Sequence, residues 1–98
     1  MEIRITSRHS KASQSLQDTI TSELQKLGKY FDKITSSHVV IESEHVVKVV
    51  EITMNTLGHQ VVATAKAENV GKAFDEALAK AERQLKKLNA KIKNHKSA

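Results

Sequence analysis

The C-terminal stretch of this sequence concentrates basic side chains. Residues 83–98 carry six lysine or arginine side chains and no acidic one, whereas residues 1–82 sum to a formal charge of −1. A local excess of positive charge on a folded element is typical of a surface that binds a polyanion. Nucleic acid is the first candidate and an anionic membrane the second. Complementation of the helix dipole accounts for a few lysines in the last turn of a helix. It does not account for six basic residues with no acid among them.

The aromatic residues limit how a nucleic acid could be recognised. Tyr30, Phe31 and Phe74 are the only three. Phe31 and Phe74 fall on apolar stripes with helical spacing and are predicted to lie in the core, whereas Tyr30 is either a base-stacking residue or half-buried at a helix end. No aromatic falls in a predicted strand, so base stacking on a sheet has no support. We expect recognition of phosphates and shape, with about six phosphate contacts and a roughly 10²- to 10³-fold loss of affinity between 50 and 200 mM salt.

Catalytic and metal chemistry find no support in the residue pattern. The chain has no cysteine, and its five histidines do not have the spacing of metal ligands. Its three glycines are too far apart to form a phosphate-binding loop, and no Ser-His-Asp arrangement is indicated. We therefore expect no enzymatic activity, no metal and no cofactor.

The 98 residues fit one domain, residues 1–98, with a basic tail at about 93–98. No apolar run approaches the roughly 18 residues that span a bilayer, and the N-terminus has no apolar signal core. We expect a cytoplasmic protein that does not bind membranes.

The rest of the sequence predicts the elements that position the basic side chains. Residues 2–7 alternate between apolar and polar, which is typical of a short strand. Ser13 is a suitable N-cap for a helix whose apolar stripe ends near Phe31. Three strands rich in β-branched residues and a long helix follow, at residues 35–43, 46–56, 60–67 and 70–94.

This β-α-β-β-β-α order predicts an α+β fold, a two-layer sandwich with two helices packed on one face of a four-stranded mixed sheet. A right-handed crossover through the first helix would set the first strand parallel to a later one, and short connections make the other neighbours antiparallel. Small residues at 63, 65 and 67 would let a helix pack closely. On the final helix, spacings of +3, +4 and +4 align four basic residues on one ridge: Lys80, Arg83, Lys87 and Lys91. Lys86 and Lys93 flank the apolar stripe on its other side.

The chain resembles bacterial ribosome hibernation-promoting factors, of the ribosome-associated translation inhibitor family. The resemblance rests on the element order, the segment Lys29-Tyr30-Phe31-Asp32-Lys33-Ile34-Thr35, the strand His38-Val39-Val40-Ile41-Glu42, and the pattern from Ala73-Phe74-Asp75 to Arg83-Gln84-Leu85-Lys86-Lys87 and Lys91. It covers essentially the whole chain. It implies binding to the small ribosomal subunit and its rRNA, and to whole ribosomes, in the channel of messenger and transfer RNA near the decoding centre. Translation would be blocked and idle ribosomes stabilised under stress or in stationary phase.

The resemblance also implies which residues contact RNA. The family's basic residues on the second helix correspond to Arg83, Lys86, Lys87 and Lys91, and we add Lys80 and Lys93 from the charge pattern. The stretch after the first strand corresponds to Arg8 and Lys11, and the loop after the first helix to Tyr30 and Lys33. The chain looks like a short form, which would need a separate factor to pair ribosomes.

The sequence departs from the family at the start of the second helix. Asn69-Val70-Gly71 stand where members commonly have an Asp, an apolar residue and a Tyr. Two other hypotheses stay open. One is a general double-stranded RNA-binding module, although such modules have their lysines at the start of the second helix, where only Lys72 lies. The other is a regulator that binds a protein through the exposed sheet face.

Overall fold

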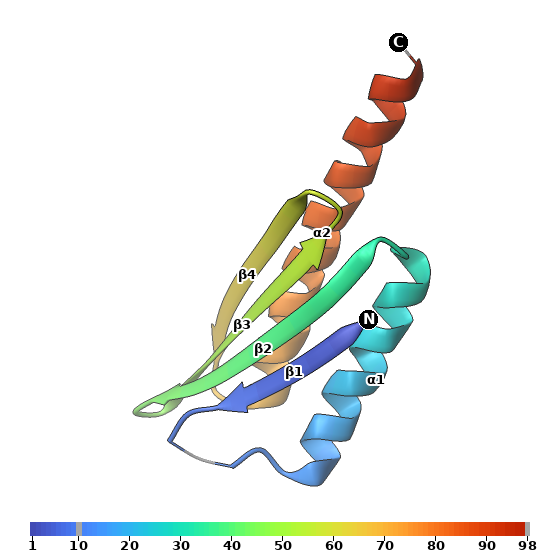
Figure 1. Ribbon diagram of the computed structural model, residues 1–98. Coiled ribbons are helices and arrows are strands. Elements are labelled where there is room, and N and C mark those ends of the chain that lie inside the picture. The colour runs from blue at the N-terminus through green and yellow to red at the C-terminus, as the bar shows by residue number, and fades with distance from the viewer. Residues whose placement is uncertain (10, 98) are drawn as a thin grey trace.

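A four-stranded sheet carries both helices on one face in the computed structural model of the chain (Figure 1). The structure describes residues 1–9 and 11–97, with side chains described as far as residue 89. The elements are β1 (Glu2–Ser7), α1 (Gln14–Tyr30), β2 (Ile34–Glu44), β3 (Val47–Thr56), β4 (His59–Ala67) and α2 (Val70–Ser97). The predicted α+β class and β-α-β-β-β-α order are confirmed.

The sheet has the order β1-β2-β3-β4 and is mixed. β1 pairs with β2 in parallel, and the other two pairs are antiparallel. α1 is the crossover that joins the two parallel strands, as predicted. It returns the chain across the sheet, so β1 and β2 run in the same direction.

Short-range signals start both helices and close the last hairpin. The backbone N–H of Leu16 donates to Ser13 Oγ at 3.1 Å, which confirms Ser13 as the N-cap of α1. The backbone N–H of Lys72 donates in the same way to Asn69 Oδ1 at 2.8 Å. Asn69, which departs from the family pattern, therefore supplies an ordinary N-cap for α2. Gly58 turns the β3–β4 hairpin with a φ of 78°, which a residue without a Cβ adopts readily.

The core lies between the sheet and the two helices. Alternate residues of the strands point into it, and on β4 these are Val61, Ala63 and Ala65, all at most 4% exposed. The small alanines let α2 pack closely against β4, as the sequence predicts. Phe74 of α2 is 2% exposed, which confirms its place in the core, and Phe31 is half-buried against the same cluster.

α2 extends past the end of the sheet (Figure 1). Its 28 residues span about 42 Å, and Leu85 is the last buried one among its side chains described as far as residue 89. The molecule is accordingly elongated, measuring 50 × 21 × 18 Å. The helix ends at Ser97 rather than at the predicted Asn94, because no glycine or proline follows Gly71 to stop it. Within the described residues, no helix is both long and apolar enough to cross a membrane.

Candidate nucleic-acid interface

The basic half of α2 presents its charges to solvent. Arg83, Lys86 and Lys87 are all exposed, on the side of the helix opposite its buried stripe of Ala77, Ala81 and Leu85. Lys86 makes one ion pair, with Glu82 at 4.0 Å, and both side chains are well solvated. Such a pair contributes little and leaves the ammonium free to exchange partners. This part of α2 is therefore available to a polyanion.

The C-terminal end of α1 lies toward the same end of the molecule, because α1 and α2 run in the same direction (Figure 1). Tyr30, the last residue of α1, is 84% exposed, which settles the open choice in favour of an exposed ring. Lys33 follows in the exposed connection to β2. The structure thus brings Tyr30 and Lys33 to the end of the molecule toward which the basic half of α2 extends.

Two lysines of α1 that were not predicted as contact residues lie near the same end of the molecule. Lys26 and Lys29 are exposed and precede Lys33 by steps of three and four residues. The three-residue spacing of Lys26 and Lys29 is the signal that could have identified them, since it places both on one side of the end of α1. Lys26 pairs with Glu23 at 3.5 Å.

Arg8 and Lys11 lie at the opposite end of α1, in the connection that follows β1. The 17 residues of α1 separate this connection from Tyr30 by about 25 Å. Arg8 also forms an ion pair with Glu42 of β2. The predicted contact residues therefore form two groups rather than one continuous patch.

Lys80 has a structural partner. Its Nζ donates to the backbone carbonyl of Thr64 at 2.9 Å, and Gln84 Nε2 donates to that of Val62 at 2.8 Å. Both carbonyls belong to β4, an edge strand whose outer backbone groups have no strand neighbour. These side chains cover part of the edge, which protects it from pairing with another chain. The basic ridge predicted from spacing is therefore not continuous, because the side chain of Lys80 bonds to the backbone of β4. Lys91 and Lys93 lie outside the residues whose side chains are described.

The face of the sheet turned away from the helices is called the open face here. It consists of the alternate side chains of Glu2–Thr6 in β1, Ser36–Glu44 in β2, Val47–Asn55 in β3 and Gln60–Lys66 in β4, together with Arg8. Its charged residues are four acids and three bases, hence a formal charge of −1: Glu2, Glu42, Glu44, Glu51, Arg4, Arg8 and Lys66. The excess positive charge of the chain is therefore concentrated on α2, whose eight basic and three acidic residues sum to +5.

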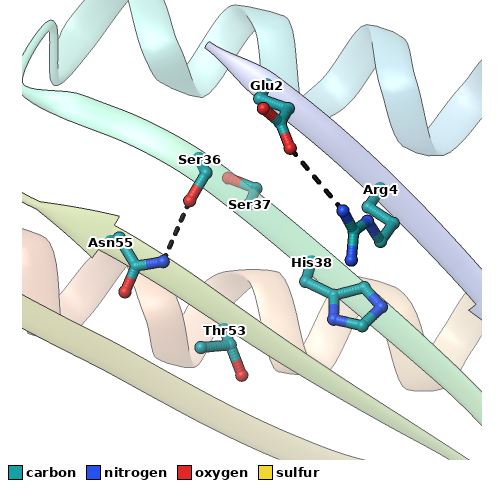
Figure 2. A pocket seen from close by; sticks show the side chains of 7 residues that line it. All are labelled: Glu2, Arg4, Ser36, Ser37, His38, Thr53 and Asn55. Carbon is teal, nitrogen blue, oxygen red and sulfur yellow. Dashed lines mark hydrogen bonds and ion pairs between the residues drawn. The ribbon is translucent and has the colours of Figure 1, made fainter.

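A polar hollow of about 330 Å³ lies on the open face, over β1, β2 and β3 (Figure 2). Arg4 and His38 lie side by side across the parallel strands, and Asn55 donates to Ser36 Oγ at 2.9 Å. A further bond of 2.8 Å joins His38 Nε2 to Thr6 Oγ1. These groups largely satisfy one another. Among the described residues, no cluster of histidine, aspartate or glutamate could hold a metal ion.

The element order, the sheet order and the basic second helix define one class of small α+β protein. The family of sigma 54 modulation proteins and S30EA ribosomal proteins matches residues 3–93, and the chain belongs to this family.

Named relatives make the assignment more specific. The chain is 35% identical over 91 residues to the ribosome hibernation promoting factor of Pseudomonas putida, covering 93% of this chain and 89% of the relative. It is 30% identical over 95 residues to the factor of the same name from Escherichia coli K12, covering 97% of this chain and all of the relative. The resemblance seen in the sequence is confirmed.

Solved structures share the fold. A ribosomal subunit interface protein from Coxiella burnetii superposes with a TM-score of 0.87 at 24% identity, over 92% of this chain and 99% of that one. The N-terminal domain of Thermus thermophilus Protein Y superposes with a TM-score of 0.81 at 22% identity, over 90% and 99% of the two chains.

Proposed function

We propose that this protein binds the small ribosomal subunit near the decoding centre, excludes messenger and transfer RNA, and so inhibits translation. It would keep inactive ribosomes stable in the cytoplasm under stress or in stationary phase. The observation that carries the proposal is the exposed basic side of α2, Arg83 with Lys86 and Lys87, in a chain of this family.

The proposed binding to rRNA is electrostatic. The three cations on α2 would replace condensed counterions on rRNA phosphates, which yields affinity without base-specific contacts. Lys33, in the connection after α1, and Lys26 and Lys29, near the end of α1, add positive charge toward the same end of the molecule. Tyr30 is the one aromatic placed to stack on an unpaired base, since Phe74 is buried and Phe31 is packed against the core.

Arg8 and Lys11 would make a second contact, about 25 Å away along α1. Two contacts at that separation fix the orientation of the protein on a folded RNA better than one patch does. Shape would then contribute to selectivity for the ribosome over arbitrary RNA. Pairing of whole ribosomes would fall to a separate factor.

Sedimentation tests the proposal. The full chain is mixed with purified small subunits at 50 mM salt and run through a sucrose gradient, with a tenfold excess of a random 30-base-pair RNA duplex as competitor. We expect the protein to migrate with the subunits and to prevent a labelled initiator tRNA from joining them. If the duplex removed the protein from the subunits as readily as an excess of further small subunits does, the chain would be a general double-stranded RNA-binding module. Protein that stayed at the top of the gradient would overturn the proposal.

A further inference from the structure

The open face is a second surface with a character opposite to that of α2. Both helices cover the other face of the sheet, so nothing in the chain's described part packs on this one (Figure 1). A hollow of about 170 Å³ lies near its middle, lined by Arg8, Val40, Glu42, Val49, Glu51 and Thr64. It is distinct from the polar hollow around His38.

Glu51 is the distinctive group in this hollow. It stands in the centre of the sheet, with Val40 of β2 and Thr64 of β4 as its cross-strand partners. Among the described side chains it makes no ion pair, whereas Glu42 pairs with Arg8 and Glu44 pairs with Lys66. The net charge of −1 on the open face is therefore left at Glu51, which is exposed.

Two of the six residues that line the hollow are valines. Val40 and Val49 are half-buried beside the carboxylate, and Val62 on the neighbouring strand is 45% exposed. Valines next to a free carboxylate complement a long cationic side chain, whose methylene stem packs on apolar groups while its charged head pairs with the acid. A phosphate backbone would meet a like charge at Glu51, because the cation that lines this hollow, Arg8, is already paired with Glu42.

We propose that the open face binds an arginine- or lysine-bearing segment of a partner protein, with the cationic head on Glu51 and the stem on Val40 and Val49. This goes beyond the proposed ribosome binding, because it uses Glu51 and the valines beside it rather than the cations proposed to contact rRNA. Dissolved salt screens the charges of the open face from those of α2. At 0.15 M the Debye length is about 8 Å, slightly less than the roughly 10 Å between packed layers. The local −1 of the open face, rather than the +5 of the chain, governs what approaches it.

The test is a titration of the full-length, ¹⁵N-labelled chain at 0.15 M salt, followed by amide chemical shifts. The probe is a capped hexapeptide of alternating arginine and alanine, and the matched peptide has glutamine in place of arginine. We expect shifts at Val40, Glu42, Val49, Glu51 and Thr64 with the arginine peptide and none with the glutamine peptide. Glu51→Gln should weaken binding about two- to fivefold, which is the range for one exposed ion pair.

The matched control is Glu76→Gln. Glu76 is exposed on α2, and within the described residues it too makes no ion pair, so the substitution removes the same charge elsewhere. It should leave peptide affinity unchanged. The proposal is overturned if Glu51→Gln has no effect, if both peptides bind equally, or if the shifts fall on the helices. It is equally overturned if a 12-nucleotide RNA, rather than the peptide, shifts the amides of Val49, Glu51 and Thr64.

Discussion

Replacing the three exposed cations of α2 should flatten the salt dependence of binding to small subunits. The change is Arg83→Gln with Lys86→Gln and Lys87→Gln. Each lost phosphate contact lowers the slope of log affinity against log salt by about 0.7 to 0.9. Three contacts lower it by roughly 2 to 3, so the loss of affinity between 50 and 200 mM salt becomes about 20- to 40-fold smaller than in the original chain.

The fold should survive this change. The three side chains are exposed, and of their bonds only the Lys86–Glu82 pair is ionic, at 4.0 Å. A pair of this kind is worth about 0 to 1 kcal/mol. Circular dichroism and the urea midpoint of the variant should therefore stay close to those of the original chain, so any change in slope reports on contacts with RNA.

A matched control removes the same total charge elsewhere. Lys48→Gln, Lys66→Gln and Lys72→Gln also take three positive charges from the chain, but from positions away from the basic end of α2. Affinity for small subunits is measured by sedimentation at four salt concentrations, with magnesium held constant. The control should keep the original slope. Equal slopes for the two triple variants would refute the reasoning, since net charge alone would then explain binding.

Three other substitutions test separate parts of the structure. Tyr30→Ala should weaken small-subunit binding about 5- to 150-fold if the ring stacks on a base, and Tyr30→Phe should not; an equal loss in both variants would contradict stacking. Phe74→Ala should lower the free energy of unfolding by about 3–5 kcal/mol, measured by urea denaturation, because the ring is 2% exposed at the centre of the core. Ser13→Ala should cost about 1 kcal/mol by the same assay through loss of the N-cap of α1, and Ser13→Asp should restore most of it.

Periodicity was enough to predict the elements, because each one buries a single face. Alternation along β2, β3 and β4 and the apolar stripes of both helices indicated which side chains point inward. The alanines at 63 and 65 then indicated where α2 packs. Ser13 could be recognised as a cap because its bond to Leu16 spans only three residues. Local chemistry therefore carries most of the fold.

Contacts between distant segments could not be predicted in this way. Lys80 belongs to the predicted ridge by spacing, but its bond to Thr64 depends on α2 lying beside the edge of β4. The pairing of Arg8 with Glu42 joins residues 34 positions apart, through the parallel pairing of β1 with β2. The absence of an ion pair at Glu51 among the described side chains could not be predicted either, because its neighbours come from two other strands.

The two surfaces should act independently, and this can be tested in one chain. Sites more than about 10 Å apart with no shared partner usually have additive effects, to within roughly 0.3–0.5 kcal/mol or about twofold in affinity. Adding Glu51→Gln to the triple variant of α2 should therefore change peptide affinity by the same factor as Glu51→Gln alone. It should also leave the flattened salt slope for small subunits unchanged. A peptide affinity that depended on the α2 cations by more than about twofold would mean that the peptide contacts α2, or that charge acts across the sheet. Independence would mean that the protein can hold RNA on the basic end of α2 and a basic protein segment at Glu51 at the same time.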